Sequence, residues 1–202
     1  LSKLTILSVG SNRIEGTIPN IGNLKDLSYL YLGDNSLDGT FPDISNLQNL
    51  KFLLIARNSF TGTFPNEWAT LTNLQQILAA NNRFDSTIPN NIGNLPLTLL
   101  SIDQNLLTGT IPASFGNFST LQTLSLSANK LSGTLPPELG GMTSLIVVNL
   151  GSNELTGTIP HEFSELAKLT DVYLGSNKFE GSVPNFPNAK LKVLGVSSNQ
   201  FT

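Results

Sequence analysis

An asparagine recurs along the whole chain at intervals of 22 to 24 residues. The nine members of the series are Asn12, Asn35, Asn58, Asn82, Asn105, Asn129, Asn153, Asn177 and Asn199. A unit of this length is too small to enclose a core of its own, so it must stack on its neighbours. The period therefore predicts a solenoid, and it directs the search for function to the surface of the stack.

Each asparagine follows a short stretch in which apolar and variable residues alternate, as in Leu124-Ser125-Leu126. A period of two residues is typical of a strand with one buried face. Strands of successive units are then expected to pair in parallel. The asparagine amide carries two donors and an acceptor, and we predict that it turns inward to bind peptide groups left unpaired where the strand ends.

A second motif follows the asparagine and contains an apolar residue, a glycine, a threonine or serine, and a proline. One copy reads Leu155-Thr156-Gly157-Thr158-Ile159-Pro160. The glycine is suited to a positive φ or to a close backbone approach. Ser86 replaces it in the fourth unit, where we expect a relaxed or slightly strained turn. The proline lacks an N–H donor and ends the second extended segment.

The combined L-x-x-L-x-L-x-x-N and L-x-G-x-I-P pattern resembles the plant-specific class of leucine-rich repeats over the full chain. The resemblance implies an α/β, β-rich fold: a right-handed solenoid with a concave parallel β-sheet of about nine strands. It also implies short 3₁₀ or helical turns on the convex side, and these are expected over residues 20–24, 67–71, 137–145 and 162–169.

Residues 1–202 are interpreted as a single array of about eight to nine repeats of 22 to 24 residues. Neither end shows a cap, and the chain has no cysteine for the disulfide-paired caps usual in the resembled family. Open solenoid ends expose core residues. We therefore expect the chain to be an uncapped internal segment of a longer protein.

Composition argues against several functional classes. Charged residues make up 12% of the chain and the formal net charge is −3, so a basic face for nucleic acid is not expected. No apolar run approaches the ~20 residues of a membrane span. The chain has no cysteine, and its only histidine, His161, is interpreted as a solvated partner of Glu162. We predict no enzymatic activity, no metal site and no cofactor in this segment.

The residues that flank the buried strand positions face the concave side, and in units two to five many are apolar or aromatic. The predicted partner-binding residues are Tyr29, Tyr31, Phe52, Leu54, Arg57, Gln76, Leu78, Leu99 and Asp103. Asp34, Asn81 and Gln104 complete the predicted rim. Exposed apolar patches usually mark contact surfaces, and tyrosine and arginine are frequent hot-spot residues. The alternative is that neighbouring strands or a flanking domain bury these side chains.

A second regular column consists of hydroxyl residues: Thr17, Thr40, Thr63, Thr87, Thr110, Thr134, Thr158 and Ser182. Threonine at strand-like spacing is compatible with an ice lattice, which makes an ice-binding module one alternative function. Threonine also favours extended structure for packing reasons. Because the column is one residue wide, the packing interpretation is preferred.

By resemblance, the chain is expected to be a ligand-recognition segment of the extracellular domain of a receptor-like kinase or receptor-like protein. It would bind a peptide or protein on its concave or lateral face, and a co-receptor is a second candidate partner. The main alternative is a soluble inhibitor or adaptor of the polygalacturonase-inhibitor type. Asn117-Phe118-Ser119 is an N-glycosylation sequon on an expected outer turn, which fits an extracellular or cell-surface location.

Overall fold

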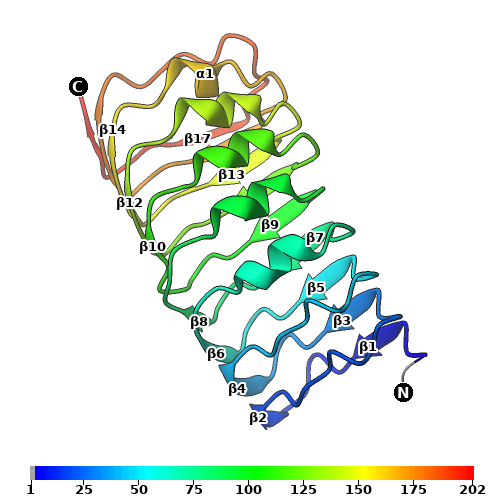
Figure 1. Cartoon of the computed structure of the whole chain (residues 1–202). Helices are drawn as coiled ribbons and strands as arrows, with labels where there is room; N and C mark the ends of the chain where they lie inside the picture. Colours follow the sequence, from blue (N-terminus) through cyan, green and yellow to red (C-terminus); the bar gives the residue numbers. More distant parts are fainter. Residues whose placement is uncertain (1–2) are drawn as a thin grey trace.

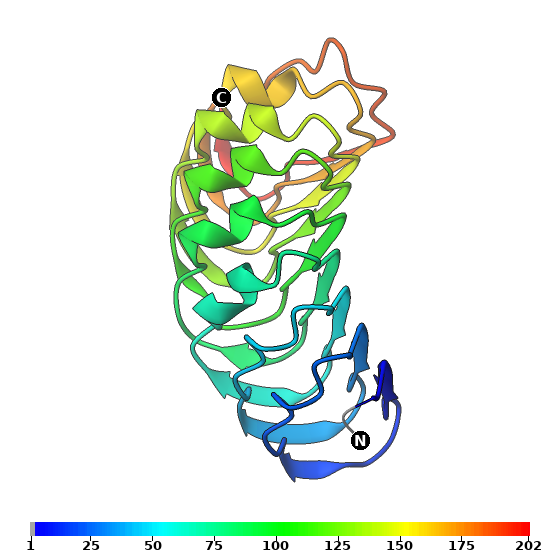
Figure 2. The same ribbon diagram turned by 45° about the vertical axis from the view of Figure 1, so that its right-hand side comes forward.

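The structure, a computed structural model, describes residues 3–202. The chain winds into a stack of coils, with its two ends at opposite ends of the stack (Figure 1). The stack curves along its length (Figure 2). We number the coils 1 to 9 by the strand that each contributes to the largest sheet, which has nine strands. The predicted solenoid is confirmed.

The largest sheet is parallel throughout and lines the concave side, with strand order β1-β3-β5-β7-β9-β11-β13-β15-β17. Each strand has three residues, and from β3 to β15 the central one is buried in the core. Its members are β1 (Ile6–Ser8), β3 (Tyr29–Tyr31), β5 (Phe52–Leu54), β7 (Gln76–Leu78), β9 (Leu99–Ser101), β11 (Thr123–Ser125), β13 (Val147–Asn149), β15 (Asp171–Tyr173) and β17 (Val193–Gly195).

The L-x-G motifs form two further parallel sheets along a lateral side of the stack. The first contains β2 (Glu15–Thr17), β4 (Ser36–Thr40), β6 (Ser59–Gly62) and β8 (Arg83–Phe84). The second contains β10 (Thr108–Gly109), β12 (Lys130–Gly133), β14 (Glu154–Gly157), β16 (Lys178–Gly181) and β18 (Gln200–Phe201).

The two lateral sheets separate at coil 4, where Ser86 stands in the glycine column. The seven glycines of that column adopt φ values of 69° to 82°, whereas Ser86 is not among the positive-φ residues. The Ser86 hydroxyl instead accepts a hydrogen bond from the Phe64 N–H at 2.8 Å. The sheets are joined by an isolated bridge between Thr87 and Thr108 and by hydrogen bonds from the Leu106 and Thr108 N–H groups to the Phe84 and Ser86 carbonyls. The turn is therefore relaxed, because a residue with a Cβ avoids the left-handed region.

Helical turns cover the outer side of coils 3 to 7. They are the 3₁₀ turns η1 (Asn66–Thr70), η2 (Asn90–Asn94), η3 (Ala113–Asn117) and η4 (Pro137–Gly141), and the α-helical turn α1 (His161–Ser164). The prediction of such a turn over residues 20–24 was wrong, because only hydrogen-bonded turns form there. The segment from Pro19 to Leu24 is one residue shorter than that from Pro65 to Leu71, which leaves too little chain for a 3₁₀ turn.

The asparagine column joins each coil to the one before it. Asn82 is buried, and its Nδ2 donates to the carbonyls of Ile55, Ala79 and Ala80 at 3.1 to 3.3 Å. Its Oδ1 accepts a hydrogen bond from the Phe60 N–H at 3.1 Å. The same pattern, with an acceptor and a donor in the preceding coil, holds for every asparagine of the series from Asn35 to Asn199. The predicted role of the column is confirmed.

One continuous hydrophobic core runs through the stack. Its outer part in coils 2 to 4 is aromatic, and the fully buried Trp68 lies at the centre of that region. The Trp68 ring packs edge-on against Phe41, Phe64 and Phe84, with ring centroids 4.8 to 6.1 Å apart. Trp68 therefore fills the core and is not accessible to a ligand.

Candidate functional site

Strand pairing on the concave side places equivalent residues of successive coils side by side. Tyr31 pairs with Leu54, Leu54 with Leu78, and Leu78 with Ser101. We call this row the middle column. A second row, the upstream column, aligns Tyr29, Phe52, Gln76 and Leu99 in the same way. The structure thus brings the predicted apolar residues of coils 2 to 5 together on one surface.

The side chains of this surface are half-buried rather than fully exposed. Part of that burial comes from neighbouring coils, as for Tyr29 and Phe52, whose ring centroids are 5.7 Å apart. Adjacent strands therefore shield these residues from each other in part, and an apolar surface still remains open to solvent.

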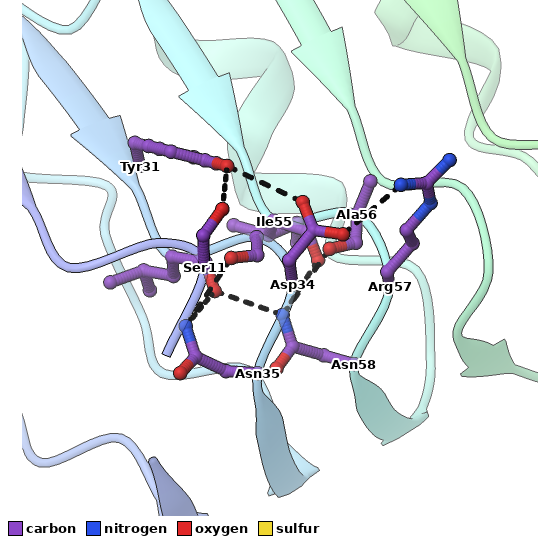
Figure 3. A network of polar contacts seen from close by, with 10 residues as sticks. Ser11, Tyr31, Asp34, Asn35, Ile55, Ala56, Arg57 and Asn58 are labelled. Carbon is purple, nitrogen blue, oxygen red and sulfur yellow. Dashed lines mark hydrogen bonds and ion pairs between the residues drawn. The ribbon is translucent and has the colours of Figure 1, made fainter. Parts of the chain in front are cut away.

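Tyr31 lies flat across the coils instead of projecting from the sheet (Figure 3). A Cβ added to Gly10 would lie 2.3 Å from the Tyr31 ring, and one added to Gly33 would lie 2.8 Å from it. The Tyr31 hydroxyl donates to an Asp34 carboxylate oxygen at 3.3 Å. Because a phenol has a single proton, the Ser11 hydroxyl, 3.1 Å away, is the donor to the tyrosine oxygen.

A ridge of left-handed residues borders the concave sheet. The residue before each asparagine of the series has a positive φ of 52° to 58°, although none is glycine. This conformation is sparsely populated for residues with a side chain. It is maintained here by the hydrogen bonds of the following asparagine. In coils 2 to 5 the ridge consists of Asp34, Arg57, Asn81 and Gln104.

An ion pair joins the first two ridge residues. Arg57 Nη1 lies 3.1 Å from Asp34 Oδ1, and the two side chains are 70% and 41% exposed (Figure 3). Solvent screening makes such an exposed pair worth only about 0–1 kcal/mol of stability. The pair is therefore more important for the shape and charge of the ridge than for the fold.

A groove of about 530 Å³ runs between the middle column and the ridge. Its floor consists of the small residues Gly33, Ala56 and Ala80, and Asp103 ends the floor in coil 5. The Ser101 hydroxyl donates to Asp103 Oδ1 at 2.7 Å. The volume falls within the range usual for ligand sites, about 300–1,000 Å³.

The groove contains five of the nine residues predicted to bind a partner: Tyr31, Leu54, Arg57, Leu78 and Asp103. The other four, Tyr29, Phe52, Gln76 and Leu99, belong to the upstream column outside it. The sequence interpretation did not single out Ala56 and Ala80 on the floor. The signal was present, since the residue one step after the buried pair is small in coils 1 to 4.

Other residues of interest lie away from the groove. His161 is 3.6 Å from Glu165, not Glu162, and its side chain is 82% exposed. Asn117 is exposed at the end of η3. Residues 3–202 contain no cluster of three acidic, histidine or cysteine side chains able to hold a metal. In the same range, no helix has the length and apolar character needed to cross a membrane.

The threonine column lies along the lateral sheets, and every member from Thr17 to Ser182 is exposed. Every threonine of the column except Thr63, which Ser86 follows in the next coil, packs its methyl group over the glycine of the next coil. A Cβ added to Gly133, for example, would lie 2.9 Å from Thr110 Cγ2. The preferred packing interpretation thus accounts for the methyl groups, while the hydroxyl side of the column faces solvent.

The family model described as Leucine Rich Repeat matches the chain five times, over residues 49–71, 73–95, 96–118, 120–142 and 144–166. No curated protein sequence gives a significant match. Many solved structures resemble the chain. One is the ectodomain of the Arabidopsis thaliana membrane receptor kinase GASSHO1/SCHENGEN3, in complex with CASPARIAN STRIP INTEGRITY FACTOR 2. It is 35% identical with a TM-score of 0.96, over 99% of this chain and 25% of that one.

Two further structures extend the comparison. The Arabidopsis receptor kinase HAESA, in complex with the peptide hormone IDA and the co-receptor SERK1, is 29% identical with a TM-score of 0.80, over 100% of this chain and 39% of that one. A plant ice-binding protein is 27% identical with a TM-score of 0.88, over 100% of this chain and 66% of that one. The chain thus spans about a quarter to two fifths of the receptor chains.

Proposed function

The chain belongs to the leucine-rich repeat family, and on that premise we propose that its concave groove recognises a peptide or an extended segment of a protein ligand. The observation that carries the proposal is the groove between the middle column and the ridge in coils 2 to 5. An apolar wall formed by Leu54 and Leu78 faces a polar ridge, which is the combination usual in ligand sites. The complex of the similar receptor kinase HAESA with a peptide hormone supports the same assignment.

The mechanism is complementarity on a rigid scaffold. Parallel strand pairing and the asparagine ladder hold the groove residues in position before a ligand arrives. Little conformational entropy is then lost on binding. We further propose that the segment is extracellular or cell-surface, that it is not catalytic, and that a co-receptor binds elsewhere on the stack. The receptor origin of the similar structures supports this location.

The test is to select short linear peptides from a phage-displayed random library on the wild-type chain. Affinities of the enriched peptides are then measured for a Leu54→Ser/Leu78→Ser variant. Loss of two wall residues should weaken binding about thirty-fold or more, because hot-spot residues contribute about 2 kcal/mol or more. The melting temperature should change little, since both side chains are only half-buried.

Ser125→Ala is the matched control, because Ser125 occupies the middle column in coil 6, outside the groove. It should leave the affinity unchanged. Peptides that bind the double variant as tightly as the wild type would contradict the proposed site.

Ice binding is the second candidate function. Two observations favour it, namely the exposed threonine column and the likeness to a plant ice-binding protein. We place it below peptide recognition because charged residues such as Glu15, Asp38 and Lys178 flank the column in several coils. An ice-recrystallisation assay with wild type and a Thr110→Lys/Thr134→Lys variant tests it. If the wild type inhibited ice recrystallisation and the variant did not, ice binding would rank above peptide recognition.

A further inference from the structure

The groove is closed on the side of coil 1. The floor positions of coils 1 and 2 are Gly10 and Gly33, and the Tyr31 ring occupies the space above both. The Tyr31 hydroxyl is held by Ser11 and Asp34 (Figure 3). Tyr31 therefore acts as an end wall over Gly10 and Gly33, and Ala56 and Ala80 form the part of the floor that the ring does not cover.

The groove is apolar where it is open. Ala56 and Ala80 form its floor in coils 3 and 4, and Ala80 is only 8% exposed. The Leu54 and Leu78 side chains line one wall here. Methyl groups on the floor and isobutyl groups on the wall favour an apolar ligand side chain, since water in such a space gains few hydrogen bonds.

The groove ends in a carboxylate without a cationic partner. Of the two acidic residues that line it, Asp34 is paired with Arg57. Asp103 receives the Ser101 hydroxyl, and it belongs to none of the ion pairs found within residues 3–202. Asp103 thus leaves a negative charge at the coil 5 end, next to the apolar floor. Such a charge attracts a cation and repels an anion.

Spacing relates the two features. Adjacent strands lie about 4.8 Å apart, so Asp103 is about 7 Å along the stack from the middle of the Ala56–Ala80 floor. In an extended peptide, side chains on the same face are two residues and about 6.7 Å apart. An extended segment lying along the groove can therefore occupy the floor with one side chain and reach Asp103 with the side chain two residues away.

We propose that the groove selects a linear peptide in which an apolar residue and a lysine or arginine are separated by one residue. The apolar side chain lies over Ala56 and Ala80, and the basic side chain pairs with Asp103. This inference rests on the proposed function and adds the chemistry of the ligand. Ala56, Ala80 and Asp103 are then the residues that determine specificity.

The experiment repeats the selection of random linear peptides on three proteins: the wild type, Asp103→Lys and Asp103→Asn. Wild type should enrich peptides with an apolar residue two positions from lysine or arginine. Asp103→Lys should enrich aspartate or glutamate at the basic position. For a peptide enriched on the wild type, Asp103→Asn should weaken binding about fivefold at low salt, and the loss should shrink as salt is raised.

Asp171→Asn is the matched control, because Asp171 is a concave carboxylate of coil 8 outside the groove. It should leave the selected pattern unchanged. Replacing the peptide's basic residue by norleucine should remove the difference between wild type and Asp103→Asn.

The outcomes separate the two proposals. If the selected peptides depend on Leu54 and Leu78 but show no preference for a basic residue, the proposed specificity is wrong and the proposed binding site is retained. Peptides with the basic preference that survive Asp103→Lys unchanged also overturn the specificity. If no enriched peptide depends on Leu54 and Leu78, both the proposed function and this inference are wrong.

Discussion

The two halves of the concave sheet have the same backbone and different surfaces. Strands β3 to β9 and β11 to β15 are paired in the same register. Buried leucine, isoleucine or valine fills the central position of every one of these strands. The middle column, however, reads Tyr31, Leu54, Leu78 and Ser101 in the first half and Ser125, Asn149 and Tyr173 in the second, so its run of adjacent apolar side chains is confined to the first half. This difference shows that the repeat motif determines the backbone and the core, whereas the residues that point outward can vary for recognition.

The largest expected effect tests whether the two halves share one core. Leu53→Ala in coil 3 and Leu124→Ala in coil 6 each remove a fully buried side chain from the same strand position. Both should lower the free energy of unfolding by about 2–5 kcal/mol. Urea denaturation monitored by circular dichroism measures the change. If one variant were neutral, the halves would not be equivalent in packing.

The next effect concerns the asparagine ladder. Asn58→Ala and Asn129→Ala each remove the acceptor of one N–H in the preceding coil, that of Leu37 or Leu107. They also remove the donor to three carbonyls. An unsatisfied buried group costs about 1–3 kcal/mol, so both variants should be clearly destabilised.

Hydrogen exchange provides the readout for the ladder. Exchange of the Leu37 amide should accelerate in Asn58→Ala, and that of the Leu107 amide in Asn129→Ala. Full stability in either variant would contradict the proposed role of the column.

A smaller effect on stability is expected for alanine substitutions at the groove-floor position, and it should differ between the two halves of the sheet. Gly10 and Gly151 both lie at the groove-floor position, but an added Cβ at Gly10 meets the Tyr31 ring at 2.3 Å. At Gly151 the nearest atom is the Gly175 carbonyl oxygen at 3.2 Å. Gly10→Ala should displace Tyr31 and lower stability by about 1–3 kcal/mol, as overpacking does.

Gly151→Ala should have a smaller effect, because its neighbour needs to move by only a few tenths of an ångström. Thermal unfolding compares the two variants, and tyrosine fluorescence reports displacement of the ring. Equal melting temperatures would mean that Tyr31 does not close the groove as described.

The smallest effect lies outside both surfaces. Asn117 is exposed on η3, on the outer side of the stack. Expression in a secretory eukaryotic host should add a glycan there, seen as a mass shift that Asn117→Gln removes. Peptide affinity should be the same with and without the glycan. A change in affinity would show that the outer side takes part in recognition.

Much of the fold was predictable because every repeat has to bury the same pattern of apolar residues and pair the same backbone groups. The alternation around Leu124 and Leu126 predicts a strand, and the inward asparagine predicts the ladder. The structure departs from the prediction where a repeat differs from the other repeats by one residue, either in its length or in its sequence. The shorter outer segment of coil 1 forms no 3₁₀ turn, and Ser86 separates the lateral sheets.

The candidate site was predictable only as a set of columns. Pairing in register follows from the period, and it aligns Leu54 with Leu78. The groove depends on side-chain directions that no pattern encodes. Tyr31 lies down over Gly10, and Arg57 turns to Asp34. Ala56 and Ala80 acquire their importance only because the residues on both sides of them are larger.

The sequence by itself determined the solenoid, its parallel concave sheet and the hydrogen-bonding role of the asparagine column, since stacking the repeats in register buries their equally spaced apolar residues together. The tertiary structure alone decided which outward residues form a groove, where it closes and which carboxylate remains unpaired. Those properties depend on contacts between residues 20 or more positions apart in the chain, such as the one between Ser11 and Tyr31. The rotamers that make these contacts are chosen by packing and not by local sequence.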